Sequence, residues 1–184
     1  MIVSGPSGVG KGTLVKRLVR ERADVTECIT CTTRAPRTGE VHGREYFFLS
    51  KEEFLQRIEE KGFLEYDEHF GNYYGTPKAF VEETLKEKSV VLEIDVVGAL
   101  NSKKVYPDCV LVMIAPPSKE VLAARLKGRG TETDEEVERR LERLEYELSQ
   151  GDKYDYVLIN DDLEEAYKNL CDLLDKEKTK TERR

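Results

Sequence analysis

Short apolar runs alternate with amphipathic helical patterns along most of the chain. Apolar runs typical of strands buried on both faces of a parallel sheet are Met1–Ser4, "SVVLEIDVV" and "CVLVMIA". Between them, apolar residues spaced three and four apart predict helices, the first over Lys11–Arg22. This order predicts an α/β fold with a mostly parallel central sheet flanked by helices.

Caps and breaks predict the remaining elements. Ser50 with Glu53 forms a capping box that opens a helix through Glu60. Thr76 followed by Pro77 predicts a helix with threonine as N-cap and proline at the first helical position. Further expected starts are a cap at Ser118 and a capping box of Thr133 with Glu136, the latter opening a helix with an apolar stripe of Val137, Leu141, Leu144 and Leu148.

Shorter β patterns and the end of the chain complete this map. Strands are expected over 28–33 and 46–49, a strand and turn over 63–75, and a last strand at "YDYVLI". A final helix is expected over 163–174, followed by a frayed tail, "DKEKTKTERR". Residues 34–80 interrupt the strand–helix alternation with a polar Pro/Gly loop and short β runs, so we expect an insertion within one domain.

Composition narrows the classes of function. The 184 residues suffice for one compact domain, and the net charge of -7 argues against a nucleic-acid partner. No apolar stretch is long enough to span a bilayer, and the N-terminus lacks the layout of a signal peptide. We therefore expect a cytoplasmic protein without a membrane partner.

The cysteines offer a weaker signal. Cys28 and Cys31 have C-x-x-C spacing, but no second pair completes a zinc set, and His42 and His69 do not follow ligand spacing. Reduced thiols near a strand are the favoured interpretation, and a metal or redox pair is the alternative.

The segment "GPSGVGK" carries the clearest chemistry, because it follows a predicted strand, precedes a predicted helix and has phosphate-loop spacing. Glycines let backbone N–H groups turn toward phosphate oxygens, and the helix N-terminus adds partial positive charge. An ordinary Gly-rich turn would explain neither the lysine nor the glycine spacing. The expected ATP contacts are Gly5, Pro6, Ser7, Gly8, Val9, Gly10, Lys11, Gly12 and Thr13.

Gly12 stands where switch-type NTPases place a Ser or Thr hydroxyl on Mg²⁺. Glycine has no hydroxyl, and Thr13 points about 100° further around the helix. The form "GKGT" is familiar in nucleoside monophosphate kinases. We expect Mg²⁺ to accompany ATP, held largely by phosphates and water, with Asp95 or Thr13 as the candidate protein contributions.

Beyond the loop, the chain resembles guanylate kinases over nearly its whole length. The matching stretches are "SGPSGVGKGTL", "TTRAPRTGEVHGREYFF", "FLEYDEHFGNYYGTP", "LEIDVVGA", "APPSKEVLAARLKGRGTET" and "INDDL". The resemblance implies phosphorylation of GMP and dGMP by ATP, in purine nucleotide metabolism, by a monomer or homodimer. It also implies a core of 1–33, 81–125 and 142–184, a GMP-binding insertion of 34–80 and a mobile lid of 126–141.

The resemblance places a phosphate clamp in the insertion. Two guanidinium groups, Arg34 and Arg37, suit the dianionic phosphate of GMP, and the phenols of Tyr46 and Tyr74 suit the same oxygens. The alternatives are solvated arginines on a surface loop and aromatic packing of short strands.

The base contacts follow in the same way. Glu65 matches the guanine reader, because a carboxylate accepts both N1–H and the N2 amino group, whereas adenine presents an acceptor there. Thr76 matches the contact to O6 unless its hydroxyl caps a helix, and Thr30 matches a further hydroxyl. Glu93 and Asp95, from "EID", are assigned to the same substrate, with Asp95 also favoured for ordering Mg²⁺-bound water.

Further cations follow from the lid segment. Arg129 and Arg140 match arginines that close over the triphosphate, and with Lys11, Arg34 and Arg37 they form the expected catalytic set. The alternative is a charged helix face with glutamate partners.

Two glycines and two polar residues complete the assignments. Gly128 and Gly130 are expected pivots of the lid. Asn160, with Asp161, matches a position near the adenine of ATP, or else caps the last helix.

Two other functions compete with this interpretation. Non-catalytic guanylate-kinase-like modules bind phosphopeptides, but their phosphate loops are degenerate, whereas Gly5, Gly8, Gly10 and Lys11 are all present here. A kinase of another nucleoside monophosphate is the other alternative, and Glu65 argues for guanine.

Overall fold

The computed structural model describes residues 1–69, 71–128 and 134–182. Its main sheet is parallel, with the strand order β2-β7-β1-β8-β9. The strands are β1 (Ile2–Ser4), β2 (Val25–Glu27), β7 (Ser89–Glu93), β8 (Leu111–Ala115) and β9 (Tyr156–Ile159). This arrangement confirms the predicted α/β fold with a mostly parallel sheet.

Side chains alternate between the two faces of this sheet and build a core on each. Ile2, Leu92 and Met113 pack on one face with α4, while Val3 and Ile114 pack on the other with α1 and α7. Because both faces are covered, the central strands read as continuous apolar runs. The helices around the sheet are α1 (Lys11–Glu21), α3 (Lys78–Thr84), α4 (Val96–Val105), α5 (Lys119–Gly128), α6 (Asp134–Ser149) and α7 (Leu163–Glu182), with a short 3-10 turn, Gly151–Lys153, after α6.

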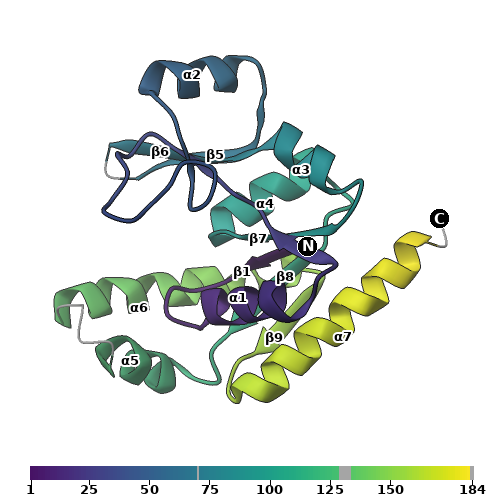
Figure 1. Cartoon of the computed structure of the whole chain (residues 1–184). Coiled ribbons are helices and arrows are strands. Elements are labelled where there is room, and N and C mark those ends of the chain that lie inside the picture. The colour runs from purple at the N-terminus through teal and green to yellow at the C-terminus, as the bar shows by residue number, and fades with distance from the viewer. Residues whose placement is uncertain (70, 129–133, 183–184) are drawn as a thin grey trace.

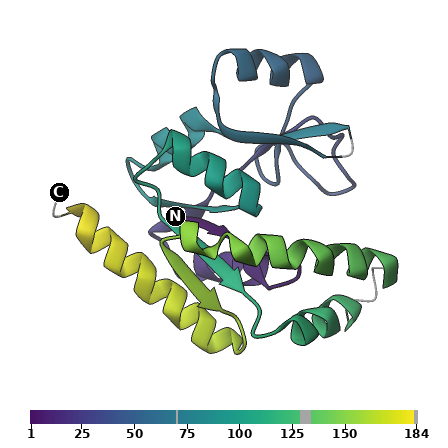
Figure 2. The ribbon, with the colours of Figure 1, turned by 180° about the vertical axis from the view of Figure 1, so that it is seen from behind.

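A second, smaller sheet projects from one end of the core (Figures 1 and 2). Its strand order is β4-β3-β6-β5, and α2 (Lys51–Glu59) packs on it through Phe54, which stacks on Phe63 with ring centroids 4.3 Å apart. The predicted capping box is present, since Glu53 N–H donates to Ser50 Oγ and Ser50 N–H donates to Glu53. The strands are β3 (Cys31–Thr32), β4 (Phe47–Phe48), β5 (Phe63–His69) and β6 (Asn72–Pro77).

One strand prediction and one helix-cap prediction need correction. Residues 28–33 do not form one strand: β2 ends at Glu27 in the main sheet, and β3 begins at Cys31 in the second sheet. Thr76 does not cap a helix either, because β6 continues through Pro77, which is itself the N-cap residue of α3. Pairing of β6 with β5, which aligns Pro77 with Phe63, overrides the local Thr-Pro signal.

The C-terminal half also departs from expectation. Instead of fraying, α7 continues to Glu182, because Glu177 accepts from the Tyr156 hydroxyl and Lys178 pairs with Asp24. Leu148 is 37% exposed, so it does not continue the apolar stripe of α6, whereas Leu144 is buried. The expected capping box of Thr133 and Glu136 lies outside the described residues.

None of the helices in the described part of the chain combines the length and apolar character that crossing a membrane would need.

Candidate active site

The loop between β1 and α1 lies at the carboxyl end of the central strand, where the strand order of the sheet reverses. Ligands of open α/β sheets bind at such a switch point. Gly5, Gly8 and Gly10 all have positive φ, of 134°, 89° and 96°, which L side chains rarely adopt. A Cβ at Gly5 would also lie 2.2 Å from the carbonyl oxygen of Ile114. The predicted phosphate loop therefore has the backbone that only its glycines permit.

Cationic side chains gather on this loop. Lys11 Nζ lies within 2.7 Å of the carbonyl oxygen of Gly5 and 2.9 Å of that of Pro6, and donates to both. Arg140, from α6, donates to Ser7 Oγ. The structure thus places two of the five predicted cations at one loop, although they come from distant parts of the sequence.

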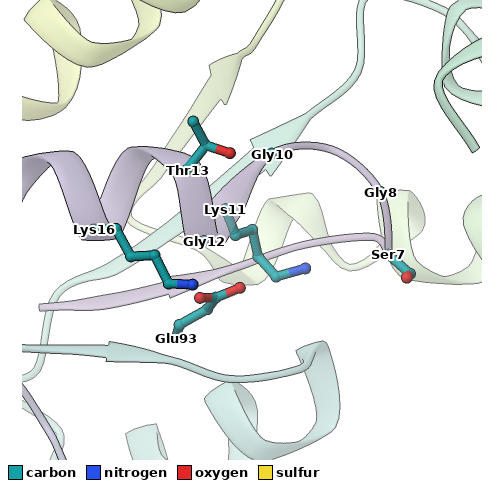
Figure 3. Close-up of a pocket in the computed structure, with 8 residues that line it drawn as sticks. All are labelled: Ser7, Gly8, Gly10, Lys11, Gly12, Thr13, Lys16 and Glu93. Carbon is teal, nitrogen blue, oxygen red and sulfur yellow. The ribbon is translucent and has the colours of Figure 1, made fainter. Parts of the chain in front are cut away.

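A cavity of about 400 Å³ opens beside the loop (Figure 3). The side chains of Lys11, Lys16 and Glu93 lie on one side of α1, and Thr13 lies on the opposite side. Lys16 was not among the predicted site residues; its signal was its position one helical turn after Gly12, on the same face. The lining residues are Ser7, Gly8, Gly10, Lys11, Gly12, Thr13, Lys16 and Glu93.

Asn160 holds the phosphate loop through a side-chain hydrogen bond. Its side chain is buried, and Nδ2 donates to the carbonyl oxygen of Val9 at 2.7 Å. It does not cap α7, because the side chain of Asp162 accepts the capping hydrogen bond from Glu165 N–H. The alternative assignment of Asn160 as a helix cap was wrong. Arg125 holds the same turn by donating to the main-chain oxygens of Asn160 and Asp161.

A second cluster lies on the small sheet. Arg34 donates to both carboxylate oxygens of Glu40, at 2.9 and 3.0 Å, and lies over the ring of Tyr46. The rings of Tyr46 and Tyr74 make an edge contact with centroids 6.2 Å apart. Arg37 lies on the exposed loop, where its N–H donates to Glu40. Glu40 is a member of this cluster that sequence reasoning missed, because nothing in a polar loop marks which glutamate folds back.

Glu65, half-buried on β5, and Thr76, buried on β6, form a polar pair. The Thr76 hydroxyl donates to Glu65 Oε1 at 2.5 Å, so this hydroxyl faces the small sheet and is not used as a helix cap. Burial is the main cause that raises the pKa of Glu65 above its usual value, and the charge of Asp95 adds to it, while the Thr76 hydrogen bond acts in the opposite direction. A carboxylate with one oxygen bound to Thr76 keeps acceptor capacity for a ligand.

The pair meets the core at α4. Asp95 is the N-cap of α4 and accepts from Gly98 N–H at 2.7 Å. A Cβ at Gly98 would lie 3.2 Å from Glu65 Oε2 and 3.3 Å from Asp95 Oδ1. Asp95 therefore lies beside Glu65, whereas Glu93, from the same "EID" stretch, lines the phosphate-loop cavity.

Comparison with known proteins decides the family. The guanylate kinase family model matches residues 1–177. The chain belongs to the guanylate kinase family. A guanylate kinase of Caldanaerobacter subterraneus subsp. tengcongensis is 47% identical over 184 residues, covering 100% of this chain and 89% of the relative. A Synechocystis guanylate kinase is 45% identical, covering 96% and 93% of the two chains.

Solved structures give the same picture. The crystal structure of guanylate kinase from Anaplasma phagocytophilum superposes with a TM-score of 0.73 at 32% identity, covering 96% of this chain and 84% of that one. A shikimate kinase from Bacteroides thetaiotaomicron, at 18% identity and a TM-score of 0.54, shares the fold alone.

Four further positions were expected from the guanylate kinase resemblance. Arg129 and Gly130 lie outside the described residues, and Gly128 is the last residue of α5. Thr30 precedes β3, and its carbonyl accepts from Phe47 N–H at 2.8 Å. Within residues 1–69, 71–128 and 134–182, no group of three or more His, Cys, Asp or Glu side chains is placed to hold a metal ion.

Proposed function

We propose that this chain transfers the terminal phosphoryl group of ATP to GMP or dGMP, producing ADP and the corresponding diphosphate. The observation that carries the proposal is the Glu65–Thr76 pair, an acceptor carboxylate on the small sheet whose strand β3 leads into the loop that carries Arg34. A phosphate loop alone would support many nucleotide kinases. The second cluster supports a second, phosphorylated substrate with a guanine base.

Guanine recognition would rest on the chemistry of a carboxylate. Guanine presents two adjacent donors, N1–H and the N2 amino group, and Glu65 can accept both. Adenine presents an acceptor at N1, so the half-buried carboxylate would face another acceptor and receive no hydrogen bond from N1, which disfavours AMP strongly. The Thr76 hydroxyl lies at the same carboxylate, and because it has a single proton it would turn from Glu65 to donate to O6 when guanine binds.

The phosphate of GMP would bind between Arg34, Arg37, Tyr46 and Tyr74. In the structure the carboxylate of Glu40 accepts hydrogen bonds from the guanidinium of Arg34. A phosphate dianion would compete for the same N–H donors. We therefore propose that Glu40 holds Arg34 in place until the phosphate arrives.

The transfer needs no strong base. A phosphomonoester has a second pKa of about 6, so the attacking GMP oxygen is already largely deprotonated at neutral pH. That oxygen forms a bond to the γ-phosphorus while the bond to the β–γ bridging oxygen breaks. Lys11 and Arg140 at the loop, with Arg129 from the proposed lid, would stabilise the charge that spreads over the transferring group.

The loop has a carboxylate beside it that could contact the metal that kinases use with ATP. A Cβ at Gly12 would lie 3.0 Å from Glu93 Oε2, so the missing side chain leaves a carboxylate oxygen beside the phosphate cavity. Oxygen ligands of this type suit Mg²⁺, which also keeps several waters and phosphate oxygens. When bound, Mg²⁺ would neutralise charge on the β- and γ-phosphates.

The test is an assay of ADP production with GMP, dGMP, IMP and AMP. We expect turnover with GMP and dGMP, and far weaker turnover with AMP. In Glu65→Gln the preference for GMP over AMP should fall by at least about a hundredfold, within the range seen when a site built to bind donors loses its partner. Binding of an ATP analogue should be unchanged.

Glu59→Gln is the matched control, because Glu59 is exposed on α2 and the chemical change is the same. Absence of any GMP-dependent ADP production by the natural chain would refute the enzyme assignment. An unchanged KM for GMP in Glu65→Gln would refute Glu65 as the reader.

A further inference from the structure

Gly12 is not required by the backbone. It is the second residue of α1 and is not among the glycines with positive φ, unlike Gly5, Gly8 and Gly10. In such a helical conformation glycine is less stable than alanine or serine. The reason for a glycine at this position must therefore lie in what surrounds it.

The surrounding group is a carboxylate. Glu93 is the last residue of β7, which pairs with β1 and aligns Glu93 with Val3 just before the phosphate loop. A Cβ built on Gly12 would lie 3.0 Å from Glu93 Oε2 and 3.4 Å from Oε1. A serine or threonine at Gly12 and Glu93 in its present position would crowd one another. A side chain at Gly12 would therefore require the Glu93 carboxylate to move by a few tenths of an ångström or more from its present position.

We propose that Glu93 replaces the loop hydroxyl: its carboxylate stands against the bare Cα of Gly12 and provides the protein oxygen for the Mg²⁺ that accompanies ATP. This inference rests on the proposed function for its nucleotide. Magnesium accepts carboxylate and hydroxyl oxygens alike, so the exchange of one for the other conserves the ligand type. Glutamate is one methylene longer than aspartate, so the carboxylate of Glu93 extends into the space that a side chain at position 12 would fill.

Neither of the other two candidates is placed as well. Asp95 Oδ1 accepts the capping hydrogen bond from Gly98 N–H, and the residue lies on the Glu65 side of α4. Thr13 also lines the cavity, but its side chain lies on the opposite side of α1 from Glu93 (Figure 3). Glu93 lies with Lys11 and Lys16 in the phosphate-loop cavity, where the triphosphate would bind.

The first test measures metal binding without turnover. Mn²⁺ is titrated by electron paramagnetic resonance into the full chain bound to a non-hydrolysable ATP analogue. In Glu93→Gln we expect the affinity for Mn²⁺ to fall by at least about tenfold, the scale for loss of a group that supports a metal site. The affinity for the analogue in EDTA should stay within about twofold, because the phosphates still meet the loop and Lys11.

Glu27→Gln is the matched control. Glu27 is a half-buried carboxylate on the neighbouring strand β2, close enough that the charge of Glu93 raises its pKa, after the larger effect of burial. It is not among the residues that line the cavity beside Gly12. Its variant should bind Mn²⁺ like the natural chain. Equal affinity for Mn²⁺ in Glu93→Gln and the natural chain would overturn the proposal.

The second test exchanges the two oxygens. Gly12→Ser alone should weaken Mn²⁺ binding because the new side chain displaces Glu93, and Glu93→Asp alone should weaken it because the carboxylate is too short. The combination Gly12→Ser with Glu93→Asp should recover most of the affinity. A double variant no better than the weaker single variant would refute the exchange. Melting temperatures verify folding, and the Glu93→Gln arm stands even where Gly12→Ser fails to fold.

These measurements need neither GMP nor catalysis. Loss of Mn²⁺ affinity in Glu93→Gln supports the proposal even where GMP turnover is absent. Unchanged Mn²⁺ affinity refutes the proposal even where GMP turnover is intact. The two failures are therefore separable.

Discussion

At the scale of single residues, Glu65 shows a conflict between folding and binding. Its carboxylate is largely withdrawn from water and lies near the charge of Asp95, and both effects disfavour ionisation. The proposed contact with guanine requires the ionised form, because only that form accepts two hydrogen bonds without offering a proton. The site therefore holds a charge that costs stability until a ligand supplies donors.

This conflict predicts a pH-dependent gain in stability for Glu65→Gln. The pKa of Glu65 is raised above 4.5 in the folded state, so the folded state holds its proton to higher pH than the unfolded state. The free energy of unfolding should then fall as the pH rises from about 4.5 through the raised pKa, and level off above it. Glutamine does not titrate, so the variant should lack this fall and be more stable at neutral pH.

Urea unfolding of the ligand-free protein across this range measures the difference between the two chains. It should be largest at neutral pH and shrink as the pH is lowered. The same pH dependence in Glu59→Gln and the natural chain shows that the effect belongs to Glu65. A pH-independent difference between natural chain and Glu65→Gln would contradict the argument.

At the scale of elements, the phosphate loop depends on the turn between β9 and α7. Asn160 donates from a buried side chain to Val9 and stands so close to Gly10 that a Cβ there would lie 2.5 Å from its Nδ2. Arg125, from α5, holds the main chain of the same turn. Three segments distant in sequence thus fix one loop conformation.

Removing the Asn160 amide should therefore loosen the loop. Asn160→Ala leaves the buried oxygen of Val9 without its donor, which is expected to cost about 1–3 kcal/mol in the free energy of unfolding. The KM for ATP should rise as well, because the loop N–H groups lose their fixed orientation. Urea unfolding and steady-state kinetics measure the two effects.

Asp161→Ala is the control for stability, since that side chain is exposed and Arg125 donates only to its main-chain oxygen. Equal stability of both variants would contradict the role of Asn160.

Comparison of elements shows what sequence patterns can and cannot predict. The buried strands and the phosphate loop were predictable, because continuous apolar runs and glycines at positive φ have local causes. The N-terminus of α3 was not, since pairing with β5 extends β6 over the Thr76-Pro77 signal. The last turns of α7 depend on contacts with Asp24 and Tyr156, which no local pattern reveals.

The residues of the candidate site also fall into two groups, those that the sequence predicted and those that depend on the fold. Lys11 and the loop glycines were predicted from spacing, and Glu65 and Arg34 from family resemblance. Glu40 and Lys16 were missed, because their positions depend on how the chain folds around them. The placement of Glu93 against Gly12 depends on the register of β7 beside β1, which the sequence does not state.

At the scale of the whole molecule, the proposed in-line transfer requires the two clusters to be held at a fixed separation. The small sheet meets the core at Gly98, where Glu65 and Asp95 approach the same Cα. A helix interior normally favours alanine over glycine by about 0.5–1 kcal/mol, so glycine in the first turn of α4 gives up part of that stability for close approach. In the proposed function, the junction, not either cluster alone, would set where guanine lies relative to the γ-phosphate.

Gly98→Ala should therefore separate stability from substrate binding. The new methyl group would lie 3.2 Å from Glu65 Oε2, so the carboxylate must move by a few tenths of an ångström while α4 gains a better helix former. We expect an unchanged or higher melting temperature and a several-fold higher KM for GMP. The KM for ATP should be unchanged, because the phosphate loop is untouched.

Gly151→Ala is the control, since the nearest neighbour of its new methyl group would be 3.7 Å away, in ordinary contact. A variant that loses melting temperature and affinity for both nucleotides together would show that Gly98 serves folding alone, whereas a selective rise in the KM for GMP ties the guanine site to the junction between the two sheets.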